Sequence, residues 1–319
     1  MVLFTGLGAS IESAFANPGQ GTIFAVEPFT SSLYTVSNTG VFTLVGNTVD
    51  AAGNFIAINT LAYDPSSQIM YGGEGGGGFG NPNAGNLHIV DQTNGATTLV
   101  GNNGIGSYDG LDFGLGGVLY GAVKSGPNSQ PSDLVTIDET TGQIITNIGP
   151  TGIHIAGISF DTGGVLWAMD KNGNVYTINT STAQATFVST ANPGIPAASL
   201  QILCDGTAFV GTKFAPGGNP NVFGTIDRST GAFTQLSFSP NDTIGGMTAT
   251  IVCVVGGESL SIDTTALILA GAQTSAVWIM SILVVGSVAF GALYITTRNP
   301  NNMRNIKVIL RDYLDRLYS

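Results

Sequence analysis

The chain has 319 residues, of which 43% are apolar, 9% are charged and 46 are glycine, and its net charge is −11. This apolar content argues against intrinsic disorder, and the abundance of glycine with so little charge favours sheets and turns over amphipathic helices. Eighteen of the twenty acidic residues lie before residue 265, which argues against nucleic-acid binding, since phosphate contacts need cations.

The N-terminal residues 1–16 have the form of a signal peptide. They are mostly apolar and end in Ala14-Phe15-Ala16, a small-x-small pattern that signal peptidase accepts. Glu12 interrupts the apolar run, and no basic residue precedes it. We expect a signal-peptide-like segment here, with an N-terminal arm of the following domain as the alternative.

A motif of threonine, any residue, an apolar residue and Gly or Ser recurs along the chain. It starts at Thr43, Thr98, Thr146, Thr186 and Thr234, in steps of 55, 48, 40 and 48 residues. Three further runs of β-forming residues precede each copy after the first, as within 158–189. Repeats of this length with four strands each are typical of propeller blades. We therefore predict an all-β, five-bladed β-propeller over 20–254, with six blades as the alternative.

The first repeat lacks its inner strand, because Gly21–Val26 already has the pattern of a second strand. The stretch Ile244–Cys253 can supply the missing strand from the other end of the domain. The first blade is then closed by both chain ends, which removes exposed sheet edges.

The third and fourth strands are joined by the pattern D-x-x-x-G at Asp91, Asp138 and Asp227. Aspartate can accept hydrogen bonds from the backbone that follows it, and glycine supplies the left-handed residue of the turn. We interpret these aspartates as turn residues and not as a series of ligands.

Units of the form L-Y/x-T-I-D-x-x-T-G-x-x-T-x-V-G, with L-Y-G upstream, resemble the secreted YVTN/NHL-like propeller repeats of bacteria and archaea. The resemblance covers about residues 20–250. It implies the propeller fold and says little about function, because propellers carry many functions.

Long connections follow the second strand of three blades, at 72–86, 124–133 and 213–221. In a propeller they lie on one rim, and long loops on a rigid scaffold are frequent binding sites. Unselected variation of Gly-rich loops is the alternative. The candidate ligand-binding residues on this rim and at the axial mouth are Asn59, Glu74, Asp109, Lys124, His154 and Lys213.

No catalytic or metal-binding motif is evident. The glycines at 73–80 lack the Lys-Ser/Thr of a phosphate loop, and no G-x-S-x-G elbow occurs. Asp109 and Asp112 could hold calcium together with carbonyl groups, but no D-x-D-x-D-G loop is present. We predict no catalytic residue, no metal site and no cofactor, with calcium as a weak alternative.

Two modifications are conceivable outside a cell. Asn179 and Asn241 each begin an N-x-Ser/Thr acceptor for glycosylation. Cys204 is predicted in the inner strand of the fifth blade, over Ile202–Asp205, and Cys253 in the closing strand of the adjacent blade. There they either form a disulfide or remain two buried thiols.

The C-terminal region follows a linker at 255–265. We predict a transmembrane helix within 266–297, because Ala276–Ile295 is twenty residues without a charge, enough to span the hydrocarbon core of a bilayer. Five basic residues lie within 298–319, which predicts a cytoplasmic amphipathic tail and an extracellular propeller. The segment Gly256–Trp278 is similar to C-terminal anchors of archaeal cell-surface proteins.

Three functions remain open from the sequence. The first is a single-pass, membrane-anchored binding or structural protein of the cell surface, which contacts an envelope glycan, polymer or protein through its outward rim. The second is an extracellular hydrolase or lyase with its site in the axial mouth, near His154 and Asp109. The third is an accessory subunit of a membrane complex that uses the helix and the basic tail.

Overall fold

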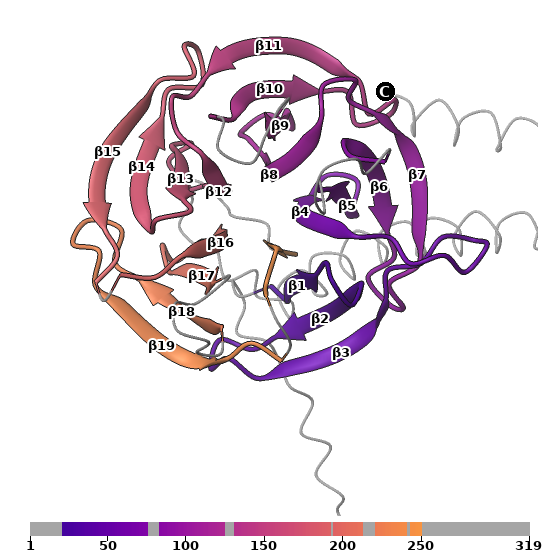
Figure 1. Cartoon of the computed structure of the whole chain (residues 1–319), viewed down its shortest axis with the longest axis horizontal. Coiled ribbons are helices and arrows are strands. Elements are labelled where there is room, and N and C mark those ends of the chain that lie inside the picture. Colours follow the sequence, from indigo (N-terminus) through magenta and orange to yellow (C-terminus); the bar gives the residue numbers. More distant parts are fainter. Residues whose placement is uncertain are drawn as a thin grey trace, which may run out of the picture. The chain divides into compact units, whose positions relative to one another are not determined.

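The computed structural model describes residues 21–75, 83–124, 131–192, 194–212, 221–240 and 243–250. The chain divides into two units, Met1–Val255 and Gly256–Ser319, and every described residue belongs to the first. The described residues form twenty strands in five four-stranded antiparallel sheets, which surround a common axis as blades (Figure 1). The predicted five-bladed β-propeller is confirmed, and the six-bladed alternative is wrong for this part of the chain.

Each blade has four strands, which are named below in order from the axis outward. Blade 1 comprises β20 (Gly246–Ala249), β1 (Ile23–Glu27), β2 (Ser32–Val36) and β3 (Phe42–Asn47). Blade 2 comprises β4 (Ile58–Asp64), β5 (Ile69–Glu74), β6 (Asn86–Val90) and β7 (Thr97–Asn102). Blade 3 comprises β8 (Ser107–Phe113), β9 (Leu119–Lys124), β10 (Asp133–Ile137) and β11 (Ile144–Pro150). Blade 4 comprises β12 (Ile155–Phe160), β13 (Leu166–Asp170), β14 (Asn174–Ile178) and β15 (Ala185–Thr190). Blade 5 comprises β16 (Ala197–Ile202), β17 (Ala208–Thr212), β18 (Val222–Ile226) and β19 (Phe233–Phe238).

The first blade is built from both ends of the described chain, as the sequence predicts. Strand β20 pairs antiparallel with β1, with Ile23 opposite Ala249 and Val26 opposite Gly246. Thr22 and Thr250 extend this pairing, because the amide of Thr250 donates to the carbonyl of Thr22 over 2.9 Å. The ring therefore closes through backbone hydrogen bonds between segments more than 200 residues apart.

The core lies between neighbouring blades. One pair of facing residues on the two innermost strands recurs in every blade and shows how this core is filled. In every blade an aromatic side chain on the second strand stands opposite a small or polar residue on the inner strand, where the ring narrows toward the axis. The pairs are Phe24 with Thr248, Tyr71 with Ala62, Tyr120 with Asp112, Trp167 with Ser159, and Phe209 with Gln201.

Contact between blades explains the glycine of the repeated motif at Gly46 and Gly101, whereas a Cβ atom on Gly149 would meet no atom within 4 Å. A Cβ atom on Gly46 would lie 2.0 Å from the carbonyl oxygen of Asn94, and one on Gly101 would lie 1.9 Å from that of Thr141. Both oxygens belong to the turn between the third and fourth strands of the next blade. Blade 4 carries Ser189 at this position, whose hydroxyl donates to the carbonyl of Arg228 over 2.8 Å.

The D-x-x-x-G segments are turns, as predicted. Asp91 Oδ1 accepts from the amide of Thr93 over 2.8 Å, and Gly95 closes the turn with φ of +82°. Asp138 and Asp227 accept from the backbone in the same way. Hydrogen bonds from the Thr or Ser hydroxyl two residues later, and then those from the backbone amides, lower the pKa of all three carboxyl groups, that of Asp227 to about 2.

Cys204 differs from the prediction that it lies in an inner strand. β16 ends at Ile202, and Cys204 lies in the turn that leads to β17. All six residues of β16 are buried, because an inner strand packs against a blade on each side. The alternation of polar and apolar residues, which indicates where a strand begins and ends, is therefore missing here. The inner strand was predicted too far toward the C-terminus of the chain.

No helix in the part of the chain that the structure describes is long and apolar enough to cross a membrane. The signal-peptide-like residues 1–16, the predicted transmembrane segment and the basic tail lie outside the described residues.

The contact at Gly101 predicts a loss of stability when this residue gains a side chain. Gly101→Ala should lower the free energy of unfolding by about 2 kcal/mol or more, because the methyl group overlaps a backbone oxygen that cannot move without its turn. Urea denaturation measures the change. Gly194→Ala is the matched control, since a Cβ at Gly194 meets no atom within 4 Å, and equal losses in the two variants would contradict the account.

Candidate functional site

The long connections lie on one rim of the propeller, which we call the long-loop rim. Residues 75–85 join β5 to β6, residues 125–132 join β9 to β10, and residues 213–221 join β17 to β18. On the opposite rim, which we call the short-turn rim, every connection within a blade has four to six residues. The inner strands β4, β8, β12, β16 and β20 begin at the long-loop rim and surround its axial mouth (Figure 1).

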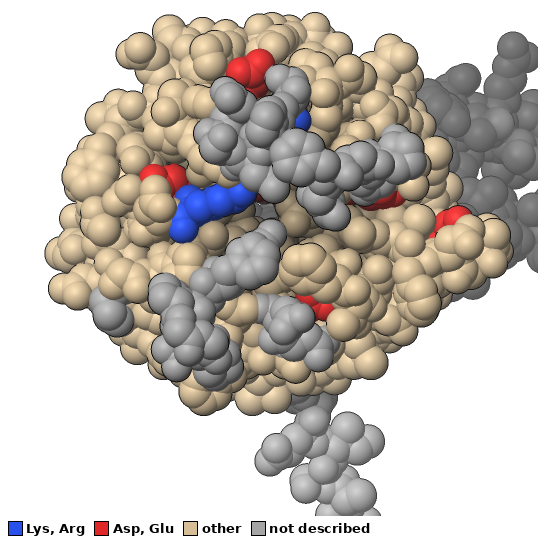
Figure 2. All heavy atoms as spheres, in the orientation of Figure 1, with Lys and Arg blue, Asp and Glu red and all other residues tan. Residues whose placement is uncertain are grey.

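A small pocket of about 60 Å³ lies at this axial mouth. Its lining includes Asn59, Asp109 and Lys124, three of the residues predicted from the sequence, together with Lys171. Figure 2 views this rim and shows basic side chains near its centre, with acidic atoms beside them. The structure therefore brings half of the predicted binding residues into one pocket.

Asp109 and Lys124 form an ion pair inside blade 3. Lys124 Nζ lies 3.2 Å from Asp109 Oδ1, and the two side chains are only 8% and 6% exposed, Asp109 the more so. Ser132 completes the arrangement by donating its hydroxyl to Asp109 Oδ2 over 2.9 Å. Both carboxylate oxygens are thus already occupied, which keeps a buried charge satisfied.

Asn59 joins two blades at the same mouth. Its side-chain amide donates to the carbonyl of Tyr108 over 2.9 Å, which links β4 to β8. This bond fixes the side chain that a ligand in the pocket would meet.

His154 precedes β12, and its Nε2 atom is buried without a hydrogen-bond partner among the described residues. Burial lowers its pKa to about 4, and the charges of Lys171 and Lys124 add to this effect while Asp109 opposes it. The ring is therefore neutral at pH 7. A group with so low a pKa is a weak general base at that pH, although it can still exchange hydrogen bonds with a ligand.

Glu74 is placed differently from the other predicted residues. It is buried at the end of β5, 2% exposed, and its Oε1 lies 2.7 Å from Nε2 of His88 on the neighbouring strand. Its carboxylate therefore joins two strands of blade 2 and does not face solvent.

The remaining predicted residues lie elsewhere. Asn179 is exposed in the turn between β14 and β15 on the short-turn rim, where its side-chain oxygen accepts from the amide of Ser181 over 2.8 Å. Cys204 is disulfide-bonded, but Cys253, the sequence's other cysteine, lies outside the described residues, so the predicted pair stays a prediction. Lys213 and Asn241 also lie outside them.

Asp109 and Asp112 do not share a site. Asp109 lines the pocket of the long-loop rim, whereas Asp112 lines a larger cavity of about 240 Å³ on the short-turn rim. No group of three or more His, Cys, Asp or Glu side chains in the described part of the chain is arranged to hold a metal ion. The larger cavity was not predicted from the sequence, because its polar residues come from all five blades and share no motif.

The comparisons with known proteins add little to this geometry. No protein-family model and no curated protein matches the sequence. A solved structure of hydrazine synthase from Kuenenia stuttgartiensis has 14% identity and a TM-score of 0.39, over 56% of this chain and 47% of the other. A protein of unknown function from Bacteroides caccae has 10% identity and a TM-score of 0.41, over 67% of this chain and 72% of the other. The chain thus spans about half the length of the hydrazine synthase chain, and likenesses this weak carry no functional argument.

The buried ion pair predicts that mutations of Asp109 and Lys124 have strongly coupled effects on the free energy of unfolding. Lys124→Ala should lower the free energy of unfolding by about 3 kcal/mol, because it leaves the Asp109 carboxylate buried without its cation. Combining Lys124→Met with Asp109→Leu should recover most of this loss. A double-mutant cycle in urea denaturation measures the coupling, and additive losses would show that the two side chains are not paired.

The environment of His154 predicts a pH effect on stability. Its pKa of about 4 lies below the ordinary value of 6.5, so between these pH values the unfolded chain binds a proton that the folded chain does not. The free energy of unfolding should therefore be fully present above pH 6.5 and fall as the pH decreases toward 4. Proton NMR of the imidazole should give a midpoint near 4, and His154→Gln should flatten the pH dependence; a midpoint near 6.5 would contradict the described burial.

Proposed function

We propose that this protein is a cell-surface binding propeller, anchored by one C-terminal membrane span, that presents its long-loop rim away from the membrane. The observation that supports this best is where the chain enters and leaves the ring. β1 begins at Ile23 and β20 ends at Ala249, and these two residues are register partners. Both ends of the propeller therefore leave from the short-turn rim, opposite the long connections.

An anchor attached after residue 250 would extend from the short-turn rim. The axial pocket with Asn59, Asp109 and Lys124 and the long connections would then face the surroundings of the cell. Long connections on a rigid closed scaffold suit contact with a large ligand, and we propose an envelope glycan, polymer or protein as that ligand. The mixed charge of the pocket, with Lys124 and Lys171 beside Asp109, suits a polar surface more than an apolar one.

The enzymatic alternative gains no support from the described residues. The carboxylate of Asp109 is held in a buried ion pair with Lys124 and accepts a further hydrogen bond from Ser132. His154 has a pKa too low for an effective base at neutral pH. A binding function requires neither a free carboxylate nor a titrating imidazole.

The proposed anchoring predicts how the full chain behaves in cells. The full chain should sediment with membranes and resist extraction at alkaline pH, and a protease added to intact cells should digest the propeller. A variant that lacks residues 256–319 should leave the membrane fraction, because the twenty uncharged residues from Ala276 to Ile295 supply the span. A full chain that is released by alkaline extraction, or a propeller protected in intact cells, would contradict the proposal.

A further inference from the structure

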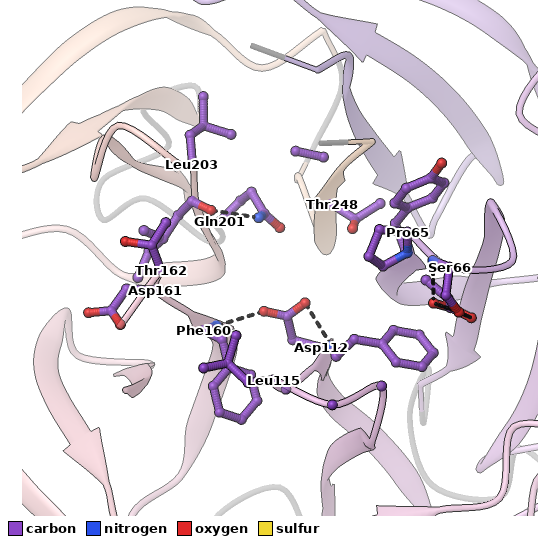
Figure 3. Close-up of a pocket in the computed structure, with 18 residues that line it drawn as sticks. Pro65, Ser66, Asp112, Leu115, Phe160, Asp161, Thr162, Gln201, Leu203 and Thr248 are labelled. Carbon is purple, nitrogen blue, oxygen red and sulfur yellow. Dashed lines mark hydrogen bonds between the residues drawn. The ribbon is translucent and has the colours of Figure 1, made fainter. Parts of the chain in front are cut away.

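The second cavity lies at the axial mouth of the short-turn rim, away from the proposed binding rim. Its volume is about 240 Å³, and all five inner strands contribute to its wall. Figure 3 shows the carboxylate of Asp112 projecting into this space, with the side chains of Gln201 and Thr248 across from it. Sites for drug-sized ligands usually enclose about 300–1,000 Å³, so this cavity suits a smaller molecule.

Asp112 occupies the register position that carries a small or polar residue in every blade. The corresponding residues are Thr248, Ala62, Ser159 and Gln201. Asp112 alone among them is charged, and a partly buried charge destabilises a fold unless something compensates it. The negative charge of Asp112 has no counterpart in the other four blades, so the position in the fold alone does not explain it.

The role of Asp112 in holding the ring does not require a carboxylate. Its Oδ2 accepts from the amide of Phe160 in the next blade over 2.7 Å, and its Oδ1 accepts from the amide of Phe113 over 2.9 Å. One blade further on, the hydroxyl of Ser159 accepts from the amide of Ile202 over 3.0 Å. A neutral hydroxyl thus makes the same inter-blade bond, and the charge of Asp112 is surplus to it.

No cation offsets this charge inside the cavity. The lining contains no lysine or arginine within the described residues, and burial raises the pKa of Asp112 to about 6, although hydrogen bonds from the two amides and from the Ser159 hydroxyl oppose this rise. A carboxylate offers about four lone-pair sites, so these three bonds leave capacity for one more donor. That capacity is available to a ligand in the cavity.

The other polar groups that face the cavity also favour a hydrogen-bond donor as ligand. Gln201 is 7% exposed, and its amide nitrogen donates to the carbonyl of Ile202 over 3.0 Å, which leaves its amide oxygen for another partner. Thr248 is 2% exposed, and its hydroxyl makes no hydrogen bond with any described residue. In Figure 3 both side chains point toward the space in front of Asp112.

Two further carboxylates line the cavity but are already engaged. Burial alone would raise the pKa of Asp64, but hydrogen bonds from Ser67 and Ser66 outweigh it and lower the pKa. Asp161 Oδ2 accepts from the indole nitrogen of Trp167 over 2.8 Å and pairs with Arg228 at 3.3 Å. Both remain ionised at neutral pH, but Arg228 offsets the charge of Asp161, so only Asp64 adds negative potential around Asp112.

We propose that this cavity binds a small organic ammonium ion, with Asp112 as its counter-ion and with Gln201 and Thr248 as acceptors for its remaining donors. The ammonium group would supply the positive charge that the cavity lacks. An amino alcohol or an amino sugar has the size and the donors that this lining accepts.

The test is calorimetric titration of the full chain in detergent with two matched pairs of probes, ethanolamine against ethylene glycol and glucosamine against N-acetylglucosamine. At pH 7.5 at least one amine should bind and its uncharged counterpart should not. Binding should weaken at least tenfold well below pH 6, where Asp112 is protonated. Asp64 and Asp161, the other carboxyl groups of the lining, keep their charge over this interval, because hydrogen bonds outweigh burial and lower their pKa.

Asp112→Ser is the decisive variant, because it copies the residue of blade 4 and keeps the inter-blade acceptor. It should reduce the affinity for the amine at least tenfold without lowering the unfolding temperature. Thr248→Val provides a second, milder reduction of several-fold. Asp91→Asn, which removes a carboxylate in an exposed turn of the same rim, should leave binding unchanged.

Three results would overturn the proposal. The first is that neither amine binds. The second is that the charged and uncharged probes bind equally, and the third is that Asp112→Ser leaves the affinity for the amine unchanged. Each of them leaves the proposed function of the opposite rim untouched, since membrane anchoring is measured independently of this cavity.

Discussion

The pairing of β20 with β1 is the constraint on which the rest of the structure depends. Each four-stranded blade buries its faces only against its neighbours, and a ring with a gap would leave two faces and an inner edge exposed. Four backbone register pairs between Ile23–Val26 and Gly246–Ala249 close that gap. Because the closure is made inside one blade and not between two, separating the chain ends would disrupt a sheet as well as an interface.

Closure also explains how the two rims come to differ. The ring forces all inner strands to run in the same direction, so both chain ends leave on the short-turn rim and the long connections lie opposite. The inner strands then line two mouths with different chemistry. The mouth of the long-loop rim contains the neutralised pair of Asp109 and Lys124, whereas the mouth of the short-turn rim contains Asp112 with no cation in its described lining.

The sequence predicted much of this fold because the repeated residues make local contacts. The aspartate and glycine of each D-x-x-x-G segment form a turn by themselves, and Gly46, Gly101 and Ser189, which end their repeats, pack on the turn of the next blade. Boundaries of the inner strands were less predictable, as Cys204 shows, because burial on both sides removes the alternation of polar and apolar residues.

The candidate sites depend on contacts that the sequence order does not reveal. Asn59, Asp109 and Lys124 could be placed at one mouth from the repeat alone, since each stands near the same end of a strand. Glu74 has the same kind of position, but its partner His88 lies on a neighbouring strand, and nothing in the spacing of these two residues indicates that they are paired. Asp112 was considered only as a calcium ligand together with Asp109, and its place in a separate cavity became evident only when the register showed Ser159 performing its structural role in the next blade.

Cross-linking across the closing pair tests the central claim most directly. Ala25 and Met247 are register partners on β1 and β20, so cysteines introduced at both positions should form a disulfide that peptide mass spectrometry detects under mild oxidation. Cysteines at Ala25 and Thr248 should not, because adjacent strand residues point to opposite faces of the sheet. Efficient cross-linking of the second pair but not the first, or of neither pair in the folded chain, would contradict a ring closed in this register.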